Sequence, residues 1–73
     1  LNKHMKTNFF NYINSFRIEE VKNMLSNKKY ENYTILALAF EAGFNSKSAF
    51  NNAFKLITGL TPSYYKKSAR EQQ

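Results

Sequence analysis

The sequence predicts an all-α protein, and two observations support this prediction. Glycine and proline are scarce in the 73 residues, where only Gly43, Gly59 and Pro62 occur, and no segment keeps the apolar–polar alternation typical of a half-buried strand. Apolar side chains instead recur at helical spacing over residues 9–27 and again over residues 46–58. A chain of this length forms one small domain, near the lower size limit for folding without disulfides or metals.

The first predicted helix is long and apolar over most of its surface. Asn8 is a good N-cap, so we expect the helix to start after it and to run to about Asn27. Its apolar stripe is too broad for a helix with a single neighbour, which predicts packing partners on two sides. Arg17 lies within this stripe, and we expect it to form a structural ion pair with Glu20 or Glu41 rather than to contact a binding partner. The stripe contains Phe9, Phe10, Tyr12, Ile13, Phe16, Ile18, Val21, Met24 and Leu25.

A short second helix and a tight turn are predicted next. After the polar connection at residues 26–33, Thr34 is expected to cap the helix ILALAFEA, which ends at Gly43. The turn requires a positive φ, which only glycine adopts freely, and a steep crossing of two helices requires a small side chain such as Ala39 where the backbones approach. Two short helices joined in this way indicate a helix-turn-helix.

The third and fourth helices have recognisable start and stop signals. Ser46 is the expected cap of a helix that runs to about Thr58 and is closed by Gly59. Thr61 followed by Pro62 is a cap with proline at the first helical position, which predicts a final helix.

The two faces of the third helix differ in chemistry. On a helical wheel of about 100° per residue, the apolar face, expected to bury against the preceding helix and Phe44, carries Phe50, Ala53, Phe54 and Ile57. The opposite face carries Ser48, Asn51, Asn52 and Lys55, with Lys47 at its edge. Asn and Ser are poorer helix formers than Glu and Lys, so solubility alone does not explain them. Asn can bind adenine, Lys can bind guanine and Ser can bind a base or a phosphate, so this face indicates nucleic acid, with an ordinary solvated face as the alternative.

The charge distribution agrees with a polyanionic partner. The formal net charge is +6, and residues 45–70 contain five basic side chains and no acidic one. Such a field favours nucleic acid first and an acidic membrane second, whereas a basic face that only aids solubility is the alternative.

The composition excludes most catalytic chemistry. Cysteine and aspartate are absent and His4 is the only histidine, so metal cages and histidine-based triads are not expected. The glutamates are too scattered for an acid–base pair. We therefore expect no enzymatic activity, no metal and no cofactor. The apolar runs are too short to span a bilayer, and no signal-peptide pattern opens the chain.

A family resemblance covers nearly the whole chain. ILALAFEAGFNSKSAFNNAFKLITGLTPSYYKK (residues 35–67) resembles the second helix-turn-helix of the AraC/XylS family of bacterial transcription regulators, and NFFNYINSFRIEEVKNML (residues 8–25) resembles its long linker helix. The matching positions are Arg17, Ile18, Ile35, Ala39, Gly43, Phe44, Ser48, Phe50, Phe54, Lys55, Gly59, Thr61, Pro62 and Tyr65. The resemblance implies a homeodomain-like helix-turn-helix fold. It also implies two helix-turn-helix halves, joined by the linker helix, that enter adjacent major-groove segments of one DNA site.

The resemblance also implies site residues, with a recognition helix at about residues 47–58. It implies base contacts by Lys47, Ser48, Asn51 and Asn52, and contacts to the DNA backbone by Thr34, Ser46 and Lys55. It assigns the turn and its packing to Ala39, Gly43, Phe44, Phe50 and Phe54. Three positions depart from the family pattern, since Asn52 replaces a frequent arginine, Ala49 replaces a commonly larger residue and Leu56 replaces a usual basic residue.

A weak internal repeat predicts the organisation of the chain. Residues 54–65 and 1–12 share an apolar helix end, a short break, a cap and an aromatic side chain. We therefore expect residues 1–7 to be the remnant of a preceding helix-turn-helix half, residues 8–27 the linker helix, and residues 34–69 the second helix-turn-helix subdomain with its C-terminal helix. Without the first half, part of the linker helix is expected to be exposed, the candidates being Phe9, Phe10, Ile13 and Phe16. This exposure is expected to cause self-association or early melting of the N-terminal end.

The expected partner is double-stranded DNA in the bacterial cytoplasm, without direct membrane contact. In a longer protein, free or anchored to a membrane, the first half and a sensing or dimerisation region would be further partners. The main alternative is a helical protein-interaction module whose basic face binds an acidic partner. A basic amphipathic helix on an anionic membrane is disfavoured, because Gly43 and the Thr61–Pro62 cap break the chain into short packed helices.

Overall fold

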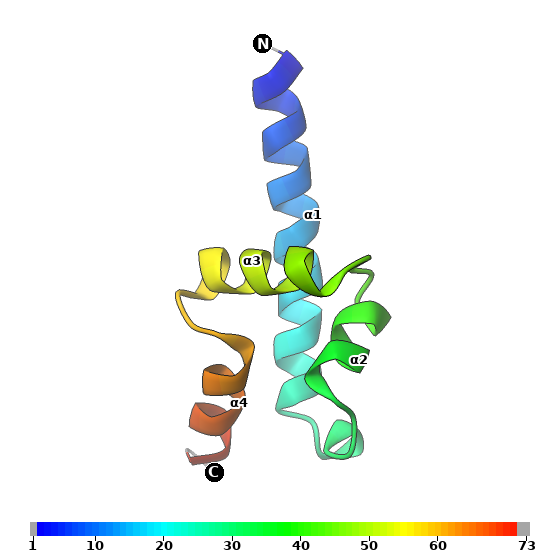
Figure 1. Ribbon diagram of the computed structural model, residues 1–73, viewed down its shortest axis with the longest axis vertical. Helices are drawn as coiled ribbons and strands as arrows, with labels where there is room; N and C mark the ends of the chain where they lie inside the picture. The colour runs from blue at the N-terminus through cyan, green and yellow to red at the C-terminus, as the bar shows by residue number, and fades with distance from the viewer. Residues whose placement is uncertain (1, 72–73) are drawn as a thin grey trace.

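The computed structural model describes the backbone of residues 2–71 and the side chains of residues 9–69. It contains helices α1 (Asn2–Leu25), α2 (Ile35–Glu41), α3 (Lys47–Thr58) and α4 (Pro62–Glu71), and a single 3-10 turn, η1 (Lys28–Tyr30). The described part of the chain has no strand, so the predicted all-α class is confirmed (Figure 1).

The start of the first helix differs from the prediction. α1 is continuous from Asn2 and passes through Asn8, so the break expected before residue 9 is absent. A preference for the N-cap position does not interrupt a helix when the preceding residues can themselves be helical, and residues 2–7 contain neither glycine nor proline. The helix also ends earlier than predicted, at Leu25. That residues 1–7 derive from a preceding half remains a prediction.

The three predicted caps after α1 are confirmed. Thr34 Oγ1 accepts a hydrogen bond from the Ala37 N–H at 3.0 Å, and Ser46 Oγ accepts one from the Ala49 N–H at 3.1 Å. Thr61 Oγ1 accepts one from the Tyr64 N–H at 3.2 Å. Each bond satisfies a backbone donor that has no partner within its helix, which explains why the short helices begin at these residues.

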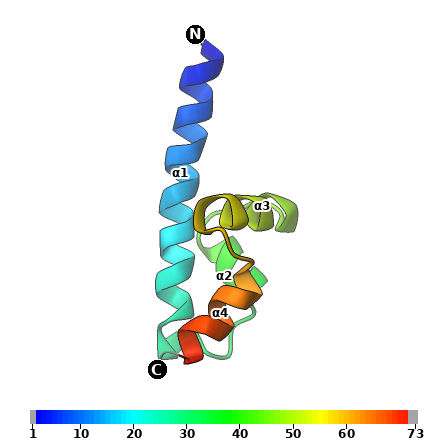
Figure 2. The same ribbon diagram turned by 90° about the vertical axis from the view of Figure 1, so that its left-hand side faces the viewer.

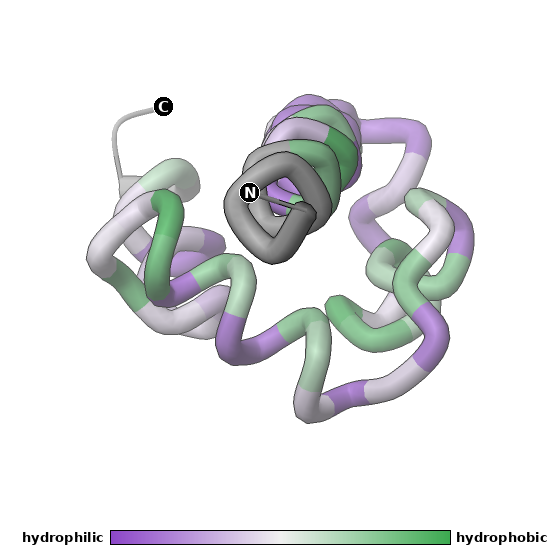
Figure 3. The backbone as a smooth tube through the Cα atoms, turned by 90° about the horizontal axis from the view of Figure 1, so that it is seen from above, coloured by the Kyte–Doolittle hydropathy of each residue, from purple (hydrophilic) through white to green (hydrophobic). Residues whose placement is uncertain are grey.

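The remaining helices pack beside the C-terminal half of α1. α2 and α3 both contact α1 and each other, and α4 contacts α3. α3 crosses α1 steeply, and the N-terminal half of α1 projects beyond the other helices (Figures 1 and 2). Seen along α1, the three shorter helices lie to one side of it (Figure 3). The molecule is accordingly elongated, with extents of 44 × 21 × 17 Å.

The core lies where α3 crosses α1. Its buried side chains are Ile18, Val21, Leu38, Ala39, Phe44, Phe50, Ala53 and Phe54. Most of the apolar face predicted for α3 is therefore confirmed, but Ile57 is 42% exposed. Ile57 lies in the last turn of α3, which extends past the crossing with α1 (Figure 1). α1 therefore does not cover this side chain.

An exposed aromatic cluster lies on α1, mostly on its projecting half. Phe9 is 61% exposed and Phe16 is 57% exposed, and Phe10 and Tyr12 are exposed to a similar degree. The rings contact each other in edge-to-face pairs, Phe9 with Phe10 and Tyr12 with Phe16. The expectation that part of the broad apolar stripe is uncovered is confirmed.

Candidate nucleic-acid interface

The turn between α2 and α3 has the geometry predicted for a helix-turn-helix. Gly43 adopts a φ of +110°, and its N–H donates to the Phe40 carbonyl at 3.1 Å. The Phe44 N–H donates to the Ala39 carbonyl at 3.0 Å. Ala39 is completely buried, as expected for a small residue at a close approach of two helices. The residues implied for the turn and its packing thus come together, with the Phe44 ring 5.3 Å from that of Phe50.

Arg17 does not form the predicted ion pair. Within the described part of the chain neither Glu20 nor Glu41 forms a salt bridge with it; its Nη1 donates to Asn14 Oδ1 over 3.4 Å. The guanidinium instead lies against the turn, with its carbon 5.7 Å from the centre of the Phe44 ring. The prediction is wrong because the packing of α1 on the turn places the guanidinium over the Phe44 ring, and an ion pair with an exposed carboxylate contributes little to stability.

The face of α3 that points away from the core carries the predicted base-contact residues. Lys47, Ser48, Asn51, Asn52 and Lys55 are all exposed on it, and we call these five residues the α3 polar face. Their side chains form no hydrogen bond or salt bridge with any other residue that the structure describes. Because α3 contains no acidic residue, nothing on this helix repels a phosphate.

The predicted backbone contacts lie at the starts of two helices. Thr34 and Ser46 are exposed, and each hydroxyl oxygen already accepts a capping hydrogen bond. The hydroxyl hydrogen of each residue is still available as a donor, which is the group that a phosphate oxygen requires. Capping therefore fixes the position of both hydroxyls without using this hydrogen.

A shallow hollow connects the α3 polar face to the starts of α2 and α4. It has a volume of about 190 Å³ and is lined by Ile35, Leu36, Lys47, Phe50, Asn51, Pro62 and Ser63. The exposed Ser63, in the first turn of α4, therefore lies beside Lys47 and Asn51, although sequence reasoning did not include it in the site. The Thr61–Pro62 cap marks a helix start, but only the tertiary structure places that start next to α3.

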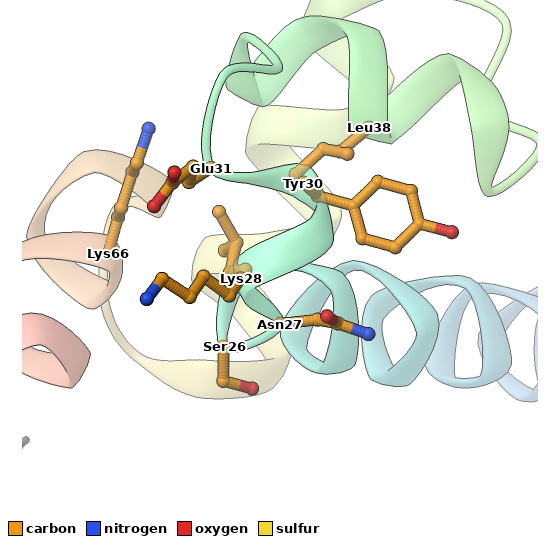
Figure 4. A pocket seen from close by; sticks show the side chains of 8 residues that line it. Ser26, Asn27, Lys28, Tyr30, Glu31, Leu38 and Lys66 are labelled. Atoms are coloured by element: carbon orange, nitrogen blue, oxygen red, sulfur yellow. The ribbon is translucent and has the colours of Figure 1, made fainter.

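A larger hollow lies away from these residues, between the end of α1, η1 and α4 (Figure 4). It has a volume of about 430 Å³ and is lined by Leu25, Ser26, Asn27, Lys28, Tyr30, Glu31, Leu38 and Lys66. It contains none of the predicted site residues. Its polar side chains are all at least partly exposed, so it lacks the buried polar groups that orient a bound ligand.

The described residues include neither a candidate membrane span nor a candidate metal site. No helix among them is both long and apolar enough to cross a membrane. No three His, Cys, Asp or Glu side chains within the described ranges are grouped closely enough to hold a metal ion.

Comparison with known proteins agrees with this geometry. A family model described as a helix-turn-helix domain matches residues 1–68. The chain is 32% identical over 65 residues to the raffinose operon transcriptional regulatory protein RafR of Pediococcus pentosaceus, covering 89% of this chain and 22% of that protein. It is 34% identical over 62 residues to the melibiose operon regulatory protein of Escherichia coli K12, covering 85% of this chain and 20% of that protein.

The chain thus spans about a fifth of the length of these curated relatives. No solved structure gives a significant match. The helix-turn-helix match extends over nearly all of the chain, from the projecting half of α1 into α4. The protein therefore belongs to the AraC/XylS family of helix-turn-helix transcription regulators.

Proposed function

We propose that this chain is a sequence-specific DNA-binding part of a bacterial transcription regulator, and that it inserts α3 into the major groove. The main support for this proposal is the α3 polar face. Its five polar or cationic side chains are exposed, have no hydrogen-bond partner among the described residues, and lie on one helix that is positioned by the helix-turn-helix turn. An α-helix fits the width of the major groove of B-DNA, where each base pair presents a distinct set of donors and acceptors. The relatives' names, which describe operon regulators, support the same function.

Base reading is assigned to four residues of this face. Asn51 and Asn52 offer an amide that can pair with the N6 and N7 atoms of adenine, and Lys47 offers a donor to O6 and N7 of guanine. Ser48 can contact either kind of base. Because Asn52 carries no charge, we expect adenine rather than guanine opposite it.

Contacts to the DNA backbone are assigned to residues around this face. Lys55 contributes charge, while Thr34 and Ser46 contribute hydroxyl donors fixed by their capping bonds. We add Ser63, because the hollow between α3 and α4 places it beside Lys47 and Asn51. Phosphate contacts of this kind orient a protein on the duplex and do not themselves read the sequence.

Selection from a randomised duplex pool tests this proposal. The chain is expected to enrich a short motif, and Asn52→Ala should weaken binding to the enriched duplex by about 1–3 kcal/mol without lowering the melting temperature. The matched control is Asn23→Ala, because Asn23 is exposed on α1 and lies outside the site. If the pool is not enriched and the chain binds polyglutamate as tightly as DNA, the proposal is wrong and the acidic-partner alternative is favoured.

A further inference from the structure

Four aromatic rings follow one another along the buried side of α3. Phe44 from the turn packs on Phe50 at 5.3 Å between ring centres, and Phe50 packs on Phe54 at 5.7 Å. Phe54 then packs on Tyr65 of α4 at 5.6 Å. This aromatic series connects the turn that precedes α3 to the helix that follows it.

Each end of the aromatic series is covered by a cation from α1. The guanidinium carbon of Arg17 lies 5.7 Å from the centre of the Phe44 ring, and Lys22 Nζ lies 5.9 Å from the centre of the Tyr65 ring. Lys22 also forms a salt bridge of 3.3 Å with Glu19 on its own helix. The two cations occupy comparable positions, but only Arg17 is at the end where α3 begins.

Arg17 also contacts the backbone of the turn. A Cβ atom added at Gly43 would lie 3.1 Å from Arg17 Nε and 3.8 Å from its Cδ and Cζ, so the side chain covers the glycine closely. The two backbone hydrogen bonds around Gly43 and Phe44 both lead back to α2, to Phe40 and Ala39. The contacts of Arg17 with Gly43 and Phe44 are therefore a direct connection between α1 and the segment that leads into α3.

We propose that Arg17 is a positioning residue for DNA recognition: its planar guanidinium holds the Gly43–Phe44 segment against α1 and so sets the angle at which the α3 polar face is presented. The proposal rests on the DNA-binding function proposed above. A guanidinium suits this role because it is flat, permanently charged and able to stack on an aromatic ring. A lysine retains the charge but has no planar group that could stack on the ring.

Two variants separate positioning from a direct charge contact. Arg17→Lys retains the positive charge but loses the planar guanidinium group. Arg17→Met removes both the charge and the planar group and retains an apolar side chain. Lys22→Met is the matched control, since it removes the α1 cation at the opposite end of the aromatic series. Affinities are measured for the duplex enriched by the wild-type chain and for a random-sequence duplex, together with the melting temperature.

We expect both Arg17 variants to bind the enriched duplex about tenfold more weakly, the equivalent of roughly one lost base contact, and to bind the random duplex as before. Lys22→Met should retain the wild-type ratio of the two affinities. A direct phosphate contact would give a different result. Arg17→Lys would then behave as wild type, whereas Arg17→Met would lower both affinities and reduce the magnitude of the slope of log K against log[salt] by about one. That outcome would show that the proposal is wrong. Equal losses on both duplexes together with a lower melting temperature also contradict it, because they indicate a role in stability alone.

A measurement without DNA keeps this proposal separate from the proposed function. Residual dipolar couplings of backbone amides report the angle between α1 and α3 in the free protein. We expect this angle to change in Arg17→Lys and to stay the same in Lys22→Met. An unchanged angle in Arg17→Lys overturns the positioning role even if the chain binds DNA, whereas a changed angle without any enriched DNA motif contradicts only the proposed function.

Discussion

At the residue scale, the two glycines with positive φ have different surroundings. Gly43 has a φ of +110° and Gly59 a φ of +80°. A Cβ at Gly59 would meet no atom within 4 Å, whereas one at Gly43 would meet Arg17 Nε. Both positions are strained for an L-residue, but only one of them is also a contact between elements that are distant in the sequence.

Replacing these glycines by alanine should separate the backbone strain at positive φ from the contact with Arg17. Gly59→Ala is expected to lower the free energy of unfolding by about 1 kcal/mol, through backbone strain alone. Gly43→Ala should lower it by clearly more, because the new methyl group also displaces Arg17. Urea denaturation measures both changes. Equal losses in the two variants would mean that the Arg17 side chain moves aside freely.

Ser46 combines capping with a predicted phosphate contact, and two substitutions separate these roles. Ser46→Ala should lower the free energy of unfolding by about 1 kcal/mol, because the Ala49 N–H loses its acceptor. Ser46→Asp preserves an acceptor at the N-cap and should leave stability unchanged, but its carboxylate repels phosphate and should weaken DNA binding. Thermal melts beside binding titrations test both expectations. Wild-type DNA affinity in Ser46→Asp would show that Ser46 does not lie in the DNA interface.

At the scale of elements, α1 has two halves with different environments. Its C-terminal half contributes Ile18 and Val21 to the core, whereas Phe9 and Phe10 of its N-terminal half and Phe16, just past the midpoint, lie on the surface. Monomeric proteins rarely expose a contiguous apolar patch of this kind. The shorter helices lie beside the C-terminal half of α1 and cover the face of Ile18 and Val21, so these aromatic rings stay exposed.

We expect the 73-residue chain to self-associate through this exposed cluster. Replacing Phe9, Phe10 and Phe16 together by glutamine should abolish the concentration dependence of sedimentation and leave the melting of the core unchanged. Phe40→Gln is the control, because Phe40 is an exposed aromatic residue of α2 that lies outside the cluster. A wild-type chain that sediments as a monomer at all concentrations would contradict this expectation.

At the scale of the whole molecule, charge should dominate the DNA affinity. The net charge is +6, and residues 45–70 contain five basic side chains and no acidic one. If three to five phosphates are neutralised, a plot of log K against log[salt] should have a slope of about −3 to −4.5. Lys55→Gln should reduce the magnitude of this slope by about one, and Lys29→Gln, in η1, should not. A slope near zero would contradict DNA binding.

The sequence by itself determined the features whose causes are local. The caps at Thr34, Ser46 and Thr61 depend on a side chain and a backbone N–H three residues later, and the positive φ of Gly43 depends on its missing Cβ. The polar and apolar faces of α3 follow from helical periodicity, so the exposure of the predicted base-contact residues was also predictable.

Only the tertiary structure decided the features that depend on which elements meet. It placed Arg17 on the turn rather than in an ion pair, brought Ser63 beside the α3 polar face and left Ile57 exposed past the crossing with α1. Each of these outcomes depends on the angle and position at which two helices pack. That geometry results from the summed contacts of residues distant in the chain, which a local pattern does not contain.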